Sequence, residues 1–372
     1  MTPIYLDYQA TTPLAPEARA AMEPWLDEKF GNPHSPHRMG REAKAAVAVA
    51  RDQLSSLLGL RQGHVVFTSG ATEAANLALK GAAWAAPAAR RKIVTLATEH
   101  ACVLDTVLWL GSHGFEAEVL PVGREGLVDL DSVRQSVDDR TAIVAAMLVN
   151  NEIGVIQPVA EIGRIAREAG ALFFCDAVQG LGRTALPDAD LIAVSAHKLF
   201  GPKGIGALWV RDGVALEPLM HGGAQEAGIR SGTLSSALCS GFGAAAALAQ
   251  KRYDQDAAHI DRLWSLGTAK LRGWTINGST EHRYRGNLNV RADGLDAARL
   301  ISDVRTVAFS AGSACASGSG RPSHVLKAID LSDAEARSSI RLGFGRYTTE
   351  DELDRALDLV LEAAAAQGLK AA

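Results

Sequence analysis

Residues 141–149, Thr-Ala-Ile-Val-Ala-Ala-Met-Leu-Val, form an almost unbroken apolar run. A strand inside a parallel sheet is covered on both faces, so its sequence is continuously apolar and does not alternate with polar residues. The run is too short for a membrane-spanning helix, which needs about 18 apolar residues or more. We therefore predict a buried strand inside a mostly parallel sheet.

Helical and strand patterns alternate on both sides of this run, through the first two thirds of the chain. Such alternation is typical of an α/β domain built around a mostly parallel sheet. The expected strands are 64–68, 92–97, 171–175, 190–195 and 205–210, and the expected helices are 41–58, one that opens within 69–76, 101–113 and 158–169.

The last third of the chain follows a different pattern. A helical stretch over 240–272 precedes shorter strands at 287–291, 307–309 and 339–342, with helical sequence between them. This pattern predicts a smaller α+β domain from about residue 255 onward. We expect no internal repeat and no long linker.

Composition and charge exclude several classes of function. The chain has 372 residues, 47% of them hydrophobic, which is enough for two domains with sizeable cores. Its net charge of −4 argues against a general nucleic-acid-binding protein, which would carry a basic face. The first residues have neither the basic nor the apolar region of a signal peptide. We therefore expect a cytoplasmic protein.

Cysteine and histidine spacing gives no metal or disulfide framework. The four cysteines are far apart, and none has the spacing of a zinc ribbon or a CxxC motif. Cys102, Cys175 and Cys239 lie in apolar strand or helix patterns and are expected to be structural thiols. No metal is predicted. The histidines that lie in turn-like sequence are His34, His37, His221 and His324, and they form no metal-binding signature.

Cys315 differs from the other three by its setting. It lies in the Gly-, Ser- and Ala-rich segment 310–320, Ser-Ala-Gly-Ser-Ala-Cys-Ala-Ser-Gly-Ser-Gly. A thiol on an exposed loop that can move suits a nucleophile that reaches a site and then a partner. The alternative is a flexible linker with an incidental cysteine, and we favour the functional interpretation.

Polar residues follow the expected strands where each strand ends. In a parallel α/β sheet, ligands bind outside the carboxyl ends of the strands, so these residues are candidates for a site. They fall in five short segments: 69–73 (Ser-Gly-Ala-Thr-Glu), 98–100 (Thr-Glu-His), 150–154 (Asn-Asn-Glu-Ile-Gly), 176–179 (Asp-Ala-Val-Gln) and 195–198 (Ser-Ala-His-Lys).

Three of these residue types suit particular chemistry, and each has a plainer alternative. Lys198 follows an apolar strand, where partial burial would lower the pKa of its amine as an imine-forming lysine requires; alternatively it is a surface lysine. Asp176 ends a strand, and a buried carboxylate there needs a partner such as a protonated pyridine nitrogen. Alternatively, Asp176 only caps the turn that follows. His100 is either an aromatic base facing a ring or an ordinary loop histidine.

Two further features concern anions. The segment 69–73 opens a helix whose N–H groups and dipole favour a phosphate, although a plain helix cap would use the same residues. Arg341 lies within a strand pattern, and its planar guanidinium suits a substrate carboxylate or, alternatively, an interdomain salt bridge.

Taken in order along the chain, seven segments resemble cysteine desulfurases of the NifS/IscS type, a class V aminotransferase-like branch of pyridoxal-phosphate enzymes. The resemblance implies an α/β chain with the fold type I of PLP-dependent transferases, in which a mostly parallel seven-stranded sheet forms a large domain (15–254). It further implies a smaller α+β domain (1–14 and 255–372) carrying the catalytic cysteine loop. The matching segments are 5–13, 30–33, 67–73, 149–154, 197–204, 230–233 and 312–315.

The resemblance also implies roles for individual residues. Lys198 resembles the Schiff-base lysine for pyridoxal 5'-phosphate, Asp176 the partner of the pyridinium nitrogen, and His100 the acid or base that stacks on the ring. Cys315 resembles the sulfur-accepting nucleophile, and Arg341 the clamp for the substrate carboxylate. Further cofactor contacts are expected from Gln179 at the ring hydroxyl and from Thr72, Ser195 and His197 at the phosphate. Ala71 and Asn151 are also expected to contact the cofactor, and Asn151 to contact the substrate as well. Thr233 is expected to reach the phosphate from a neighbouring subunit in a homodimer.

The implied activity is conversion of L-cysteine to L-alanine, with the sulfur left as a persulfide on Cys315 for delivery to an iron–sulfur scaffold or a tRNA-thiolation enzyme. A selenocysteine lyase or an aminotransferase of the same fold is the alternative enzyme, and a non-catalytic sulfur carrier or scaffold is the alternative of another class. The sequence departs from the family pattern at Ala224 and Ala227, where Gly and Arg are common.

Overall fold

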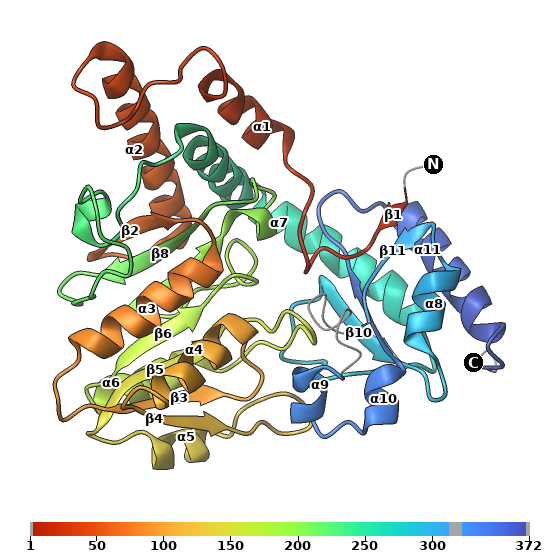
Figure 1. Cartoon of the computed structure of the whole chain (residues 1–372). Helices are drawn as coiled ribbons and strands as arrows, with labels where there is room; N and C mark the ends of the chain where they lie inside the picture. Colours follow the sequence, from red (N-terminus) through yellow and green to blue (C-terminus); the bar gives the residue numbers. More distant parts are fainter. Residues whose placement is uncertain (1–2, 312–321, 370–372) are drawn as a thin grey trace.

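A seven-stranded sheet forms the centre of the computed structural model, which describes residues 3–311 and 322–369 (Figure 1). The strand order is β2-β8-β7-β6-β5-β3-β4, and only β8 runs antiparallel to its neighbours. The strands are β2 (Gly63–Thr68), β3 (Lys92–Leu96), β4 (Glu116–Leu120), β5 (Thr141–Met147), β6 (Leu172–Asp176), β7 (Leu191–Ser195) and β8 (Gly206–Arg211).

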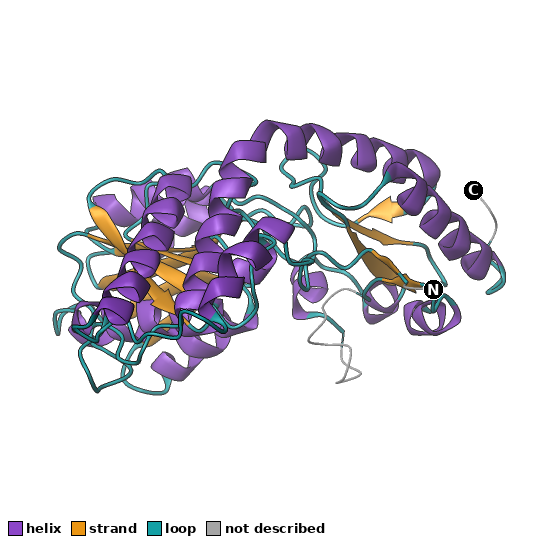
Figure 2. Ribbon diagram, turned by 90° about the horizontal axis from the view of Figure 1, so that it is seen from above, coloured by secondary structure: helices purple, strands orange, loops and turns teal. Residues whose placement is uncertain are grey.

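Helices cover both faces of this sheet, as seen from above in Figure 2. One apolar core joins the sheet to α2 (Arg38–Leu58), α6 (Val159–Glu168) and the first part of α7 (Ser236–Lys270). The opposite core joins it to α3 (Ala71–Ala85) and α4 (Ala101–Gly111). Every residue of β5 is buried, which confirms the prediction of a strand covered on both faces.

The last third of the chain has its own apolar core and a three-stranded sheet in the order β12-β10-β9. The N-terminal strand β1 (Ile4–Tyr5) joins this part, because it pairs with β11 (Val307–Ala308). The remaining elements here are β9 (Thr275–Ile276), β10 (Asn287–Arg291), β12 (Ser339–Gly343), α8 (Ala297–Asp303), α9 (His324–Ala328), α10 (Asp333–Arg337) and α11 (Glu350–Ala365).

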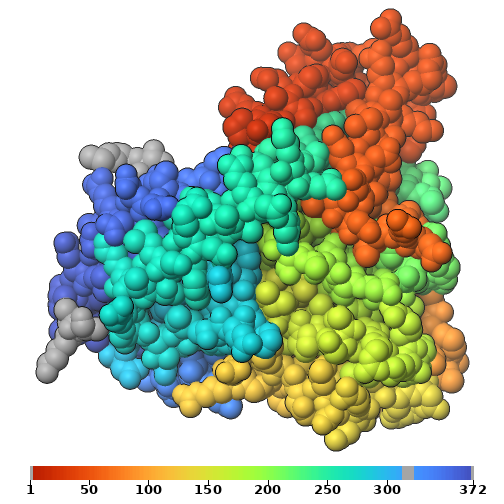
Figure 3. Space-filling view, turned by 180° about the vertical axis from the view of Figure 1, so that it is seen from behind, coloured from red at the N-terminus to blue at the C-terminus, as the bar shows by residue number. Residues whose placement is uncertain are grey.

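The two parts are joined by a continuous helix. The expected boundary at 254/255 falls inside α7, which runs for 35 residues from the core of the large sheet to the core of the C-terminal part. We therefore keep the division into 15–254 and 1–14 with 255–372 as a proposal. In the view from behind, α7 and the residues after it lie against the yellow-green middle of the chain (Figure 3).

One strand of the central sheet was not expected from the pattern. Strand β4 begins with Glu116-Ala-Glu118 and lies at the edge of the sheet, where most of its residues are at least partly exposed. An edge strand needs no continuous apolar run, and charged side chains on it discourage pairing with other chains. Within the described residues, no helix is long and apolar enough to cross a membrane.

Helices α2 and α7 pack closely because α7 carries glycine where they cross. A Cβ atom added at Gly243 would lie 2.6 Å from the Cα of Ala50 and 2.9 Å from its Cβ, so the backbones could not keep their spacing. At Gly267, farther along α7, an added Cβ would meet only the end of the Leu288 side chain, at 3.2 Å. The two glycines therefore offer a matched test of this packing.

We expect Gly243→Ala to lower the free energy of unfolding by about 1–3 kcal/mol, because overpacking against a backbone atom outweighs the gain in helix propensity. Gly267→Ala should leave stability unchanged or raise it by up to about 1 kcal/mol, since the Leu288 side chain can shift. Urea unfolding midpoints of the two variants measure the difference. Equal midpoints would contradict the proposed role of Gly243.

Candidate active site

A cavity of about 810 Å³ lies at the carboxyl ends of the parallel strands. This is where a parallel α/β sheet is expected to bind its ligand, and the volume suits a cofactor with a small substrate. Ten of the residues singled out in the sequence line it: Ala71, Thr72, His100, Asn151, Asp176, Gln179, Ser195, His197, Lys198 and Arg341.

One end of the cavity is suited to an anion. Ala71 and Thr72 are the first residues of α3, a helix of 15 residues whose free N–H groups point toward its start. The preceding turn is held by Glu73, whose carboxylate accepts the Ser69 N–H (2.7 Å) and pairs with Arg230 (2.7 Å). Despite partial burial, these bonds hold the pKa of Glu73 below its usual value.

A second segment faces this helix start across the cavity. Ser195 ends β7, and His197 follows it in a short 3-10 turn (Ala196–Lys198). Burial, with the neighbouring Lys198 charge, lowers the pKa of His197 to about 4, so its ring is neutral at pH 7. Its Nδ1 lies 3.1 Å from the Thr11 hydroxyl. A neutral imidazole and a hydroxyl here can bond an anion without adding charge.

Asp176 lies deep in the cavity, at the end of β6. Its carboxylate accepts the Val178 N–H (2.9 Å) and forms no ion pair among the described residues. Burial raises the pKa of Asp176, which means that its negative charge is poorly compensated. A cationic group placed beside it would remove that cost.

His100 caps helix α4 and faces the same space. Its Nδ1 accepts the Cys102 N–H (3.1 Å), so the proton of the neutral ring is on Nε2. Burial lowers the pKa of His100, an effect that the Asp176 carboxylate opposes. The ring is therefore a neutral aromatic group with one N–H, next to a buried carboxylate.

Lys198 projects into the cavity from the end of that 3-10 turn. Its Nζ donates to the backbone carbonyls of Gln9 (2.5 Å) and Ala10 (2.8 Å). Burial, with the charges of Arg341 and Arg183, lowers the pKa of Lys198 to about 8. A fraction of this lysine is thus a neutral, nucleophilic amine near physiological pH.

Arg341 has only 1% of its surface exposed, in the middle of β12. It pairs with Asp7 (2.7 Å) and donates to the Asn151 carbonyl (3.0 Å) and the Ser310 hydroxyl (3.3 Å), while its Nε has no partner. Asp7 and Arg341 both lie in the proposed smaller domain, so this ion pair is not the interdomain salt bridge of the alternative expectation. The contact with the large domain is the hydrogen bond to the Asn151 carbonyl. Because Arg341 also lines the cavity, a substrate carboxylate would share the guanidinium with Asp7.

Three predicted residues need separate mention. Thr233 is exposed and does not line this cavity. Gln179 lines it, but its amide already donates to the Gln9 carbonyl (3.0 Å) and accepts from Arg183 (2.7 Å). Cys315 lies outside the described residues. Its neighbours on both sides reach the site, because Ser310 bonds Arg341 and His324 lines the cavity.

His324 is a cavity residue that the sequence analysis missed, whereas Glu99 and Glu152 were named there only as members of strand-end segments. His324 lies in turn-like sequence, yet it lines the cavity, and its Nε2 lies 2.9 Å from the Glu99 carbonyl. The Glu152 carboxyl, buried with a raised pKa, accepts a hydrogen bond from Ser323. Burial also raises the pKa of Glu99 well above its usual value. The only available signal was the position of Glu99 and Glu152 in polar segments at strand ends.

The two departures from the family pattern are strained in the same way. Ala224 (φ 55°) and Ala227 (φ 56°) both have left-handed backbone conformations, which cost a non-glycine residue about 1 kcal/mol or more each. The loop between them is held by Glu226, which pairs with Arg51 (2.6 Å) and accepts the Phe67 N–H (2.7 Å). The ion pair therefore fixes a loop that its backbone alone would disfavour.

Comparison with known proteins agrees with this geometry. The chain is 43% identical over 369 residues to the cysteine desulfurase IscS of Rickettsia bellii (strain OSU 85-389), covering 96% of this chain and 90% of that protein. Among solved structures it resembles a NifS-like protein (TM-score 0.91, 32% identity, 98% and 100% of the two chains). It also resembles SspA in complex with cysteine (TM-score 0.82, 34% identity, 93% and 99%).

The model of the aminotransferase class-V family matches residues 4–356, which is nearly the whole chain and includes every described residue of the cavity. The structural likeness confirms the fold type I of PLP-dependent transferases. The chain belongs to the aminotransferase class-V family.

Proposed function

We propose that this chain is a cysteine desulfurase that converts L-cysteine to L-alanine and transfers the sulfur to Cys315. The observation that carries the proposal is one cavity in which a lysine of lowered pKa, an uncompensated carboxylate and a buried arginine converge. The similarity to the IscS protein of Rickettsia bellii supports the choice of cysteine as substrate.

Class-V aminotransferases use pyridoxal 5'-phosphate, and the residues present fit that group. Its phosphate matches the start of α3 with Ala71 and Thr72, and its cationic ring nitrogen matches the Asp176 carboxylate, which forms no ion pair with the described residues. Its carbonyl carbon matches the Lys198 amine. The proposed set is completed by Ser195 and His197 at the phosphate, His100 on the ring, Gln179 at the ring hydroxyl, and Asn151 as a further cofactor contact.

When bound, the cofactor supplies an electron sink that acidifies the Cα–H bond of the substrate. The chain's own residues do the rest. Arg341 binds the substrate carboxylate, with Asn151 beside it, and so orients the Cα–H bond. The Lys198 amine, neutral above about pH 8, accepts the Cα proton. The His100 ring holds a proton at Nε2 within the same cavity.

Cys315 is the proposed sulfur acceptor. Its thiolate attacks the substrate sulfur, an S–S bond forms, and the C–S bond of the substrate breaks with its electron pair going to carbon. Protonation of that carbon yields alanine and leaves a persulfide on Cys315, so that L-cysteine and the enzyme thiol give L-alanine and an enzyme persulfide. On either side of the segment that contains Cys315, Ser310 accepts a hydrogen bond from Arg341 and His324 lines the cavity, which supports this assignment.

The assembly and location of the enzyme are parts of the same proposal. Thr233 lies away from the cavity of its own chain and is proposed to reach the site of a second copy in a homodimer. The sulfur acceptor is proposed to be an iron–sulfur scaffold or a tRNA-thiolation enzyme in the cytoplasm. A selenocysteine lyase remains the second candidate, because the same cavity would admit selenocysteine.

We expect Cys315→Ala to reduce sulfide release from L-cysteine in the presence of a reductant by at least about 100-fold. Cys102 also lines the cavity, but burial raises the pKa of its thiol and so keeps it protonated and a poor nucleophile. The variant should still become yellow on addition of pyridoxal phosphate. Cys239→Ala, which removes a buried thiol whose pKa burial raises to about 12, is the matched control and should retain activity. Full activity of Cys315→Ala would overturn the nucleophile assignment.

We expect Arg341→Gln to raise the KM for L-cysteine about 10- to 100-fold, which is the loss of a charge-assisted hydrogen bond worth about 1.5–3 kcal/mol. Arg285→Gln removes an arginine whose partner is the exposed Asp261, and it should leave KM unchanged. Steady-state kinetics with urea unfolding separate the loss of binding from instability. An unchanged KM in Arg341→Gln would show that another group holds the carboxylate.

The pKa of Lys198 predicts how the chemical reactivity of its amine changes with pH, which can be measured without the cofactor. Because burial lowers this pKa to about 8, the neutral amine forms as the pH rises through 8. The rate of trinitrobenzenesulfonate labelling at Lys198, followed by peptide mapping, should reach half of its maximum near pH 8. Free Nα-acetyl-lysine, with a pKa of about 10.4, is the reference. A midpoint near 10 for Lys198 would contradict the burial that the structure gives it.

A further inference from the structure

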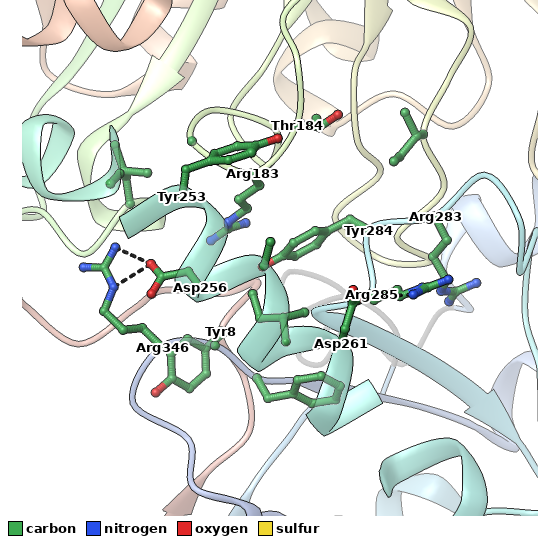
Figure 4. Close-up of a pocket in the computed structure, with 18 of the residues that line it drawn as sticks. Tyr8, Arg183, Thr184, Tyr253, Asp256, Asp261, Arg283, Tyr284, Arg285 and Arg346 are labelled. Atoms are coloured by element: carbon green, nitrogen blue, oxygen red, sulfur yellow. Dashed lines mark hydrogen bonds and ion pairs between the residues drawn. The ribbon is translucent and has the colours of Figure 1, made fainter. Parts of the chain in front are cut away.

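A second cavity, of about 280 Å³, lies where α7 meets the loop after β6 and the segments 281–285 and 344–346 (Figure 4). It shares no lining residue with the candidate active site. Leu199 and Phe200, which directly follow Lys198, form part of its wall. The cavity is thus next to the catalytic lysine segment, and the proposed reaction does not use it.

Positive charge exceeds negative charge around this cavity. Arg346 and Arg252 share the single carboxylate of Asp256, at 2.7 and 3.1 Å. Arg183 has no carboxylate partner among the described residues, and its guanidinium lies 5.1 Å from the centre of the Tyr284 ring. Figure 4 shows Arg183 beside Tyr284, with the Arg346–Asp256 pair nearby.

Arg283 adds a buried cation to the wall. It is 6% exposed, and it donates to the backbone carbonyls of Asn277 (3.0 Å), Ser279 (2.8 Å) and Asn287 (3.1 Å). Its Nη2 has no acceptor, and no carboxylate pairs with it among the described residues. This Nη2 is enclosed by protein, so Arg283 adds positive charge behind the cavity wall but offers no hydrogen-bond donor to a ligand in the cavity.

The charges around the cavity do not balance. The lining residues carry four guanidinium groups and three carboxylates, which leaves an excess of one positive charge. The third carboxylate, Glu281, is exposed to solvent, and Asp261 is paired with Arg285 (3.1 Å). Because Arg283 is enclosed, Arg183 is the arginine without a carboxylate partner among the described residues that a ligand in the cavity can meet.

The rest of the lining is apolar or aromatic, with Ile260, Phe344 and the rings of Tyr253 and Tyr284. Such walls disfavour a strongly hydrated inorganic anion and favour a ligand with an apolar body. The volume limits that body to about the size of one ring. We propose that this cavity is a binding site for a small organic carboxylate with an apolar, ring-sized body.

The site is connected to the catalytic residues through Arg183. This guanidinium donates to the Gln179 side chain (2.7 Å) and to the backbone carbonyl of Lys198 (2.5 Å). A carboxylate bound next to Arg183 would compete for these hydrogen bonds and offset part of the arginine charge. Binding in the second cavity is therefore expected to change the hydrogen bonding and electrostatic environment of Lys198, although the two cavities share no residue.

The test measures binding of benzoate to the holoenzyme by isothermal titration calorimetry, with benzamide as the neutral probe of the same shape. Ala257 is an exposed residue of α7 at the rim of the cavity, so Ala257→Phe should fill the entrance without disturbing a core. Ala258→Phe is the matched control, because Ala258 is also exposed on α7 but does not line the cavity. Ala257→Leu is a smaller block that tests for a graded effect.

We expect saturable benzoate binding that is weakened at least tenfold in Ala257→Phe, less in Ala257→Leu, and less than twofold in Ala258→Phe. Benzamide should bind at least tenfold more weakly than benzoate. Benzoate bound by Arg341 in the active site would have the same affinity in all variants, so the comparison between variants does not count it. Benzoate binding that is unchanged in Ala257→Phe, or benzamide binding as tight as that of benzoate, would overturn the proposal.

Discussion

Residues 7–12 hold the two parts of the molecule together at the active site, because they bond to both. Asp7 pairs with Arg341 of the C-terminal part, and the carbonyls of Gln9 and Ala10 accept the Lys198 amine of the large part. The Thr12 hydroxyl bonds the backbone on both sides of Lys198, donating to the His197 carbonyl and accepting the Phe200 N–H. The position of the lysine therefore depends on a segment almost 190 residues away in the chain.

The electrostatics of the cavity follow from this arrangement. Two cations, Lys198 and Arg341, and two carboxyl groups, Asp176 and Glu99, are all largely buried, and each alone would be costly. Each cation is partly satisfied by backbone carbonyls, so no single ion pair neutralises the site. Burial moves the pKa values of Lys198 and Asp176 toward neutrality, which is the condition for proton transfer near pH 7.

The sequence predicted the elements that carry a regular pattern. The buried strand at 141–147, the strand-end residues and the helix at 41–58 follow from hydrophobic periodicity, which is a local property. The contact of residues 7–12 with Lys198 could not be derived from spacing, because it joins distant segments through backbone carbonyls that any residue provides. Strand β4 was missed because its exposed edge position removes the apolar signal. His324 looked like a turn residue because its site is created by tertiary packing.

The unbroken course of α7 has a mechanical consequence. A helix of 35 residues is about 50 Å long and resists bending, and this one is embedded in the core of each part. A hinge of the usual kind, a flexible loop that lets two lobes swing apart, is absent along this connection. The relative position of the two lobes therefore depends on a stiff rod on one side and on the hydrogen bonds of residues 7–12 on the other.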